Sequence, residues 1–111
     1  MEKFPMNGPE VAQGPKSHVP EAAEYDFRVV YLAAELMKLG ENDDALKFLN
    51  KEIANSPGFS LAWSNRAVIR YQRGEITSAR EDAQNALRLD LANIQAQYLL
   101  NSLSAPAPFA P

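Results

Sequence analysis

The stretch SLAWSNRAVIRYQRGEITSAREDAQNALRLDLAN, residues 60–93, contains the pattern that decides the fold. Trp63 is followed one helical turn later by Ala67, and Gly74 then interrupts the helical spacing. After this glycine, small side chains recur at helical spacing, at Ala79, Ala83 and Ala86. Small residues let two helix backbones approach closely, and a tryptophan fills the space that remains. The stretch therefore predicts two closely packed helices with a turn at Gly74.

A second copy of this pattern lies earlier in the chain, at a constant offset. Gly74 aligns with Gly40, and Ala79 aligns with Ala45. This offset of roughly 34 residues, together with the positions of the tryptophan, the alanines and the glycine, resembles the tetratricopeptide repeat family. The resemblance implies two antiparallel helix–turn–helix repeats in a right-handed superhelix, followed by a C-terminal capping helix.

The predicted fold class is therefore all-α, with about five helices. Residues 1–20 contain four prolines and two glycines, which predict a flexible N-terminal tail. The last residues, SAPAPFAP at 104–111, predict a stiff, extended Ala/Pro-rich tail. Between the tails we expect one tetratricopeptide-like domain, residues 21–103, with repeat one at about 26–59, repeat two at about 60–93 and the cap at about 92–103.

Start and stop signals set the expected helix boundaries. The first helix is predicted to begin near Glu21, directly after Pro20, and to end at Gly40. Asn42 and Ser60 are predicted to cap the second and third helices. The expected helices cover approximately residues 21–39, 42–55, 61–73, 77–89 and 92–103.

The first helix carries apolar residues on two adjacent faces, and such a helix is predicted to be buried on both sides. Positions on the inner faces of both repeats are predicted to form the core. The predicted buried residues are Leu32, Leu49, Trp63, Ala67, Ala79 and Ala83.

Composition excludes several functional classes. Eleven Lys and Arg residues against 14 Asp and Glu residues give a net charge of −3, which argues against nucleic-acid binding. The chain has no Cys, so disulfides, thiolate catalysis and Cys-based metal sites are excluded. We see no apolar run long enough to span a membrane and no secretory signal, so we expect a cytoplasmic protein without membrane contact.

No arrangement of residues predicts catalysis. The single His, His18, lies in the N-terminal tail without an orienting partner. Asp43 and Asp44 are explained by a helix start, and the adjacent Glu81 and Asp82 diverge around a helix. Phosphate-binding loops and nucleophile elbows are absent from the sequence. We therefore predict a protein that is not an enzyme and has no metal or cofactor.

The family resemblance implies a binding groove, because the first helix of each repeat lines the concave face. The groove is expected to be apolar and aromatic, with one central amide at Asn65. Some of these side chains could instead pack against the cap or each other. The candidate groove residues are Phe27, Tyr31, Ala34, Leu61, Asn65, Val68, Tyr71 and Tyr98.

A candidate basic stripe follows the third helix, at Arg66, Arg70 and Arg73. It could contact an acidic partner, pair with acidic side chains of a neighbouring helix, or be solvated. Arg66 and Arg70 occupy positions where the family usually has Leu and Tyr. Their stems would then have to lie along apolar surface.

Asn65 also matches one residue of the carboxylate-binding repeats of certain chaperone co-factors. The other four positions of that clamp, where the resemblance implies Lys, Asn or Arg, are occupied here by Phe27, Tyr31, Gln95 and Leu99. We therefore expect a non-catalytic adaptor or scaffold that binds a protein or peptide segment. The alternatives are a self-associating module, such as a homodimer, and a carboxylate clamp. The occupant of the groove could also be the chain's own Phe-bearing tail.

Overall fold

The computed structural model describes residues 25–104, and our expectations for the two tails and for His18 lie outside these residues. The described part is all-α and contains five helices, which confirms the predicted fold class. No strand occurs in residues 25–104. The helices are α2 (Phe27–Lys38), α3 (Asn42–Asn55), α4 (Ser60–Gln72), α5 (Ile76–Leu89) and α6 (Ile94–Ser104).

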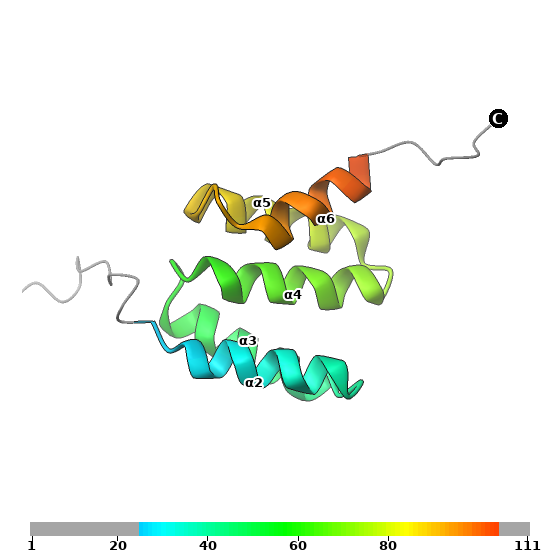
Figure 1. Cartoon of the computed structure of the whole chain (residues 1–111). Helices are drawn as coiled ribbons and strands as arrows, with labels where there is room; N and C mark the ends of the chain where they lie inside the picture. Colours follow the sequence, from blue (N-terminus) through cyan, green and yellow to red (C-terminus); the bar gives the residue numbers. More distant parts are fainter. Residues whose placement is uncertain (1–24, 105–111) are drawn as a thin grey trace, which may run out of the picture.

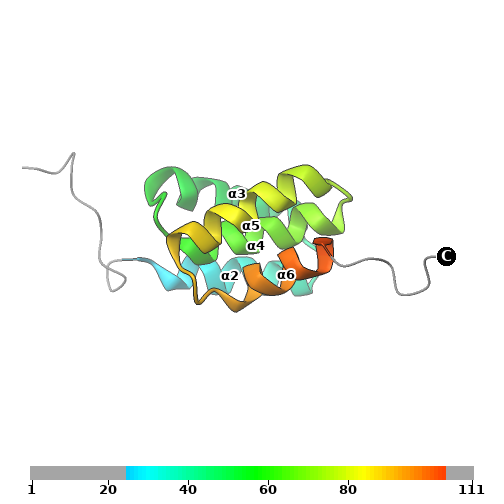
Figure 2. The same ribbon diagram turned by 90° about the horizontal axis from the view of Figure 1, so that it is seen from above.

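The helices form two pairs and a final single helix (Figure 1). Helix α2 packs on α3, and α4 packs on α5. Helix α4 also contacts α2, the first helix of the preceding pair, and α6, the single helix that follows. Figure 2 shows α3 and α5 on one side of the stack and α2 and α6 on the other. The chain therefore builds a short stack in which α2, α4 and α6 form one layer.

The two helix pairs close their turns in the same way. Gly40 and Gly74 have φ angles of 81° and 82°, in the left-handed region that glycine adopts without a steric penalty. The residue after each glycine donates its N–H to a carbonyl near the helix end, from Glu41 to Leu36 at 2.8 Å and from Glu75 to Arg70 at 2.9 Å. This is the Schellman arrangement of a helix end. The period of the sequence is thus repeated in the backbone.

The core consists of two clusters with different side chains. The first cluster lies between the two helix pairs and is built from large residues such as Leu49, Phe59 and Ile69. The second lies between α4, α5 and α6 and is rich in alanine. Fully buried alanines permit close contact within the second pair, as predicted. The buried alanines of this pair are Ala62, Ala67, Ala79, Ala83 and Ala86.

Two expectations about the first helix were wrong. The helix begins at Phe27, with the Asp26 side chain accepting the Arg28 N–H as an N-cap, rather than near Glu21. Leu32 is 44% exposed instead of buried, and Tyr31 is exposed beside it. The residue of α4 equivalent to Leu32 is Arg66, which contacts Asn50 of the first helix pair. Leu32 has no such neighbour, because no described helix precedes α2. The apolar pattern of α2 therefore exceeds what its neighbours cover.

Capping also differed from the prediction at two positions. Asn42 and Ser60 are the first residues of α3 and α4, and the N-caps are Glu41 and Phe59. Ser60 turns its hydroxyl inward, where it donates to the carbonyl of Ala86 at 2.8 Å. Trp63 packs against both core clusters but is partly buried rather than fully buried, because it also lines a depression open to the surface.

Candidate functional site

Three pairs of candidate groove residues occupy equivalent positions on α2 and α4. Phe27 corresponds to Leu61, Tyr31 to Asn65 and Ala34 to Val68, each pair being one repeat period apart. Spacings of four and three residues place each set on one helix face. Leu61, Ala34 and Val68 are partly buried, and Tyr31 is 69% exposed. We call the surface formed by these six residues the α2–α4 face.

Asn65 lies near the centre of this face and is only 6% exposed. Its side-chain amide makes no hydrogen bond with any other residue of the described range. Within that range, the one fully buried side-chain polar atom without a partner is Oδ1 of Asn42, so the Asn65 amide keeps some contact with the surface. Such an amide loses part of its hydration on folding and gains no hydrogen bond to the protein that would compensate the loss. Asn65 is therefore equipped to bond to a group that arrives from outside.

The aromatic candidates lie in three different surroundings. Phe27 meets Phe59 edge-on, with ring centroids 5.1 Å apart, and so belongs partly to the core. Tyr71 is exposed near the C-terminal end of α4. Tyr98, on α6, is 74% exposed. Its equivalents in α4 and α2 are Ser64 and Val30, which face the following helix, so Tyr98 lies toward the open end of the stack.

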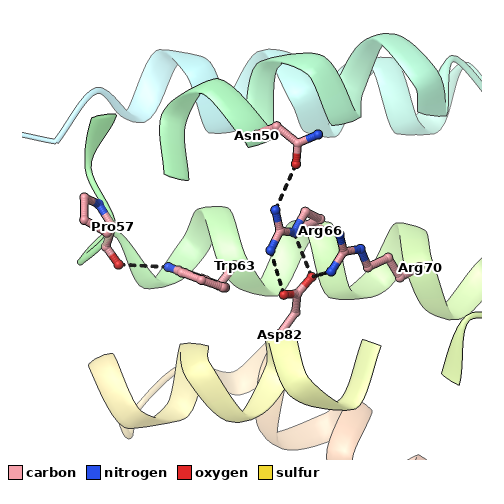
Figure 3. Close-up of polar contacts among 6 residues, drawn as sticks. All are labelled: Asn50, Pro57, Trp63, Arg66, Arg70 and Asp82. Atoms are coloured by element: carbon pink, nitrogen blue, oxygen red, sulfur yellow. Dashed lines mark hydrogen bonds and ion pairs between the residues drawn. The ribbon is translucent and has the colours of Figure 1, made fainter. Parts of the chain in front are cut away.

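The candidate basic stripe is paired within the chain, and Figure 3 shows the contacts of Arg66 and Arg70. Arg66 donates to both carboxylate oxygens of Asp82 on α5, at 2.8 and 2.9 Å. Arg70 donates to the same carboxylate at 3.0 Å. Arg66 also donates to Asn50 of α3 at 2.9 Å. Arg73 pairs with Asp43 of α3. All three arginines thus have partners on neighbouring helices, which is one of the alternatives considered for the stripe.

Trp63 extends this network. The guanidinium carbon of Arg66 lies 5.2 Å from the centroid of the indole ring, within cation–π range. The indole N–H donates to the carbonyl of Pro57 at 2.9 Å. The long side chain of Arg66 therefore covers apolar surface while its charge is held by hydrogen bonds.

A buried polar cluster around Asn93 was not predicted. The Asn93 amide nitrogen donates to the hydroxyls of Ser60 at 2.8 Å and Ser64 at 3.0 Å. Its amide oxygen accepts the N–H of Ala96 at 3.0 Å and so caps α6. The signal was present in the sequence, because an Asn directly before an apolar helix is a typical N-cap.

Glu52 is the buried acid of the first helix pair. Its carboxylate has no ion-pair partner among residues 25–104, and burial raises the pKa of this group, with a further contribution from the nearby charge of Asp26. One repeat period later, Glu52 corresponds to Ala86 and Asp26 corresponds to Ser60. In the second pair these two positions are joined by a neutral hydrogen bond, whereas in the first pair they hold two acids.

Two surface hollows lie away from the α2–α4 face. One, of about 290 Å³, is lined by Pro57, Trp63, Asn85, Arg88 and Leu89. The other, of about 470 Å³, is lined by Gln84, Leu87, Arg88, Leu91 and Leu100. Both are lined in part by residues of the C-terminal half of α5. They are open depressions between side chains and bring together no titratable pair.

Residues 25–104 hold no group of three His, Cys, Asp or Glu side chains placed to bind a metal. None of the described helices has the length and apolar character needed to cross a membrane. Comparisons with protein-family models, with curated proteins and with solved structures find no match.

Proposed function

We propose that this chain is a non-catalytic protein-interaction module of the tetratricopeptide type, an adaptor or scaffold that acts in the cytoplasm. It holds a peptide or helical segment across the α2–α4 face. The common turn geometry at Gly40 and Gly74, one period apart, supports the family assignment. The layer of α2, α4 and α6 supports it as well, because the first helix of each repeat shares one surface.

The observation that carries the proposal is the state of Asn65. The residue is 6% exposed, and its side-chain amide lacks a hydrogen-bond partner among the described residues. An extended peptide offers N–H and C=O groups along its length, and an asparagine can donate to one and accept from the other. A bound segment would therefore satisfy Asn65 and replace the hydration that its confinement removes.

Exposed aromatic residues of α2 and α4 supply the apolar part of the proposed contact. Tyr31 on α2 and Tyr71 on α4 are both exposed and bring large, rigid side chains. Such residues commonly dominate binding energies at interfaces. The basic stripe does not contribute, because Arg66, Arg70 and Arg73 are paired with carboxylates of the chain itself.

The carboxylate-clamp alternative receives no support from these positions. Leu99, which occupies one clamp position, is buried in the second core cluster, and Phe27 contacts Phe59. Self-association, the remaining alternative, is supported by α6 rather than by the α2–α4 face.

A peptide selection tests the proposed binding face. A phage-displayed library of random peptides is selected against the 111-residue chain, and the affinity of an enriched peptide is measured for the wild type and for Tyr31→Ala, Tyr71→Ala and Asn65→Ala. Each tyrosine truncation should weaken binding by about 2 kcal/mol or more while changing the melting temperature little. Leu89→Ala is the matched control, because Leu89 is exposed on α5, away from the face.

Two results would contradict the binding face. A large fall in melting temperature for both tyrosine variants would show that these rings belong to the core. Equal loss of affinity in Leu89→Ala would place the peptide on another surface.

A further inference from the structure

The outward side of α6 carries large apolar side chains. Ile94 and Tyr98, one helical turn apart, are 76% and 74% exposed. Leu91, in the preceding loop, is 79% exposed. The side-chain amide of Gln97 donates to the Leu91 carbonyl at 2.5 Å, which holds this loop against the helix. We call Leu91, Ile94 and Tyr98 the α6 patch.

The α6 patch faces away from the core. At about 100° per residue, Ile94 and Tyr98 lie on the opposite side of the helix from the buried Ala96 and the partly buried Leu103. Among the other large hydrophobic residues of the described range, Leu39, at 73%, and Tyr31, at 69%, approach this exposure, but both lie at the other end of the stack, on α2 and the turn after it. Such a concentration of exposed apolar side chains marks an interaction surface.

The equivalent side of α4 is covered by the next helix of the stack. Ser60 and Ser64, the equivalents of Ile94 and Tyr98, are buried and bond to Asn93 at the start of α6. That side of the helix therefore receives the next helix of the stack. On α6 no described helix follows, and apolar residues replace the two serines.

The charge distribution favours a two-fold arrangement of two copies. Residues 91–104 contain no charged side chain. A two-fold axis brings the same surface of both copies together, so a patch of one charge sign would repel itself, whereas a neutral apolar helix is self-complementary.

The other end of the stack does not fit α6. Arg28, on the exposed side of α2, is equivalent to Ala62 and Ala96, which are both fully buried. Arg28 is paired with Asp26 and Glu35 is paired with Lys38 on this side. Stacking α2 of one copy on α6 of another would bury these charges. This argues against head-to-tail assembly, which would form open filaments.

A hollow beside the patch enlarges the surface. The depression of about 470 Å³ is lined by Leu87, Leu91 and Leu100 together with the polar Gln84 and Arg88, and so shares Leu91 with the patch. It can receive a large side chain from a second copy. The contact then extends from α6 onto α5, as a specific interface of adequate area requires.

We infer that the α6 patch pairs with the same patch of a second copy, forming a two-fold homodimer through α6. This arrangement leaves the α2–α4 face uncovered for its proposed peptide. It goes beyond the proposed function and does not depend on it.

Sedimentation velocity of the 111-residue chain over a wide concentration range tests the dimer. The wild type should pass from monomer to dimer as concentration rises. Tyr98→Asp should weaken dimerisation by at least about tenfold, because each copy would bring a carboxylate into the apolar contact. Circular dichroism should show the same helix content, since Tyr98 lies outside the core. Mixing Tyr98→Asp with Tyr98→Lys should restore association.

Leu39→Asp is the matched control, because Leu39 is equally exposed but lies at the turn between α2 and α3. It should dimerise like the wild type. A wild type that stays monomeric at every concentration would overturn the inference. So would a Tyr98→Asp variant that dimerises normally, or equal loss in Leu39→Asp. Failure of the Asp and Lys variants to associate in the mixture would contradict the pairing of one α6 patch with the other. None of these results affects the peptide selection.

Discussion

Arg66 of α4 and Asp82 of α5 form a two-bond ion pair in which the carboxylate is 3% exposed. Arg70 adds a third bond to the same carboxylate. The two arginines compensate the cost of burying Asp82, and the hydrogen bonds fix the crossing of α4 over α5. Bidentate arginine–carboxylate pairs are geometrically specific as well as strong.

Removal of the Asp82 carboxylate should be strongly destabilising. Asp82→Ala leaves two arginines with no buried counter-charge, and breaking such a pair typically costs about 3–5 kcal/mol. Urea unfolding followed by circular dichroism measures the loss. Asp44→Ala is the control, because Asp44 pairs with Lys47 at the surface, at 3.7 Å, and such pairs contribute about 1 kcal/mol or less. Similar losses in both variants would show that the buried pair has no special role.

Enlarging Ala79 should disrupt the contact between α4 and α5. Ala79 is fully buried, so Ala79→Leu inserts a large side chain into filled space and should cost about 1–3 kcal/mol. Ala54→Leu, on the exposed side of α3, should change stability little. The comparison is made by thermal unfolding. An unchanged melting temperature in Ala79→Leu would contradict the proposed packing.

Gly74 should resist substitution because of its backbone conformation alone. No atom lies within 4 Å of the position a Cβ would take, and φ is +82°. Gly74→Ala should therefore lose about 1–2 kcal/mol of unfolding free energy, the cost of the left-handed region for a residue with a Cβ. Gly74→Asn should lose less, because asparagine tolerates this region. Equal stability of the wild type and both variants would contradict the left-handed conformation of residue 74.

Neutralising Glu52 should stabilise the fold at pH 7. Burial raises its pKa above the ordinary value of 4.5, so the native state holds the Glu52 proton more tightly than the unfolded state. The free energy of unfolding therefore falls as the pH rises from the ordinary pKa through the raised one. Glu52→Gln removes this loss, and its advantage over the wild type should shrink as the pH is lowered through that window. The measurement is urea unfolding at several pH values.

Glu81→Gln is the control for Glu52, because Glu81 is exposed on α5. Its stability should follow that of the wild type at every pH. A Glu52→Gln variant that is no more stable than the wild type at pH 7 would show that burial does not disfavour this charge.

The sequence was sufficient for the features that depend on local backbone and small side chains. Gly40 and Gly74 end their helices as predicted, and Ala67, Ala79 and Ala83 are buried as predicted. These features follow from rules that act within a few residues. The exposure of Leu32 was not predictable in the same way, because it depends on whether another helix precedes α2.

The polar contacts between helices were the least predictable part. The spacing of Arg66, Arg70 and Arg73 was evident, but their partners Asp82 and Asp43 lie on other helices. Only the relative rotation of the helices decides which carboxylate each arginine meets. The candidate site was predictable in its α2–α4 positions, which share a sequence register. The exposure of Tyr98 could not be predicted from its own helix, because it depends on whether another helix packs on α6.

The hydrogen bonds of Asn93 have a consequence for the order in which the chain folds during synthesis. The N-terminal part of a chain leaves the ribosome first. The hydroxyls of Ser60 and Ser64 can accept the hydrogen bonds of the Asn93 amide only after Asn93 has been synthesised. The same amide starts α6 through Ala96. The second helix pair therefore reaches its final polar interior in the same step that docks α6, whereas the first pair needs nothing beyond α4.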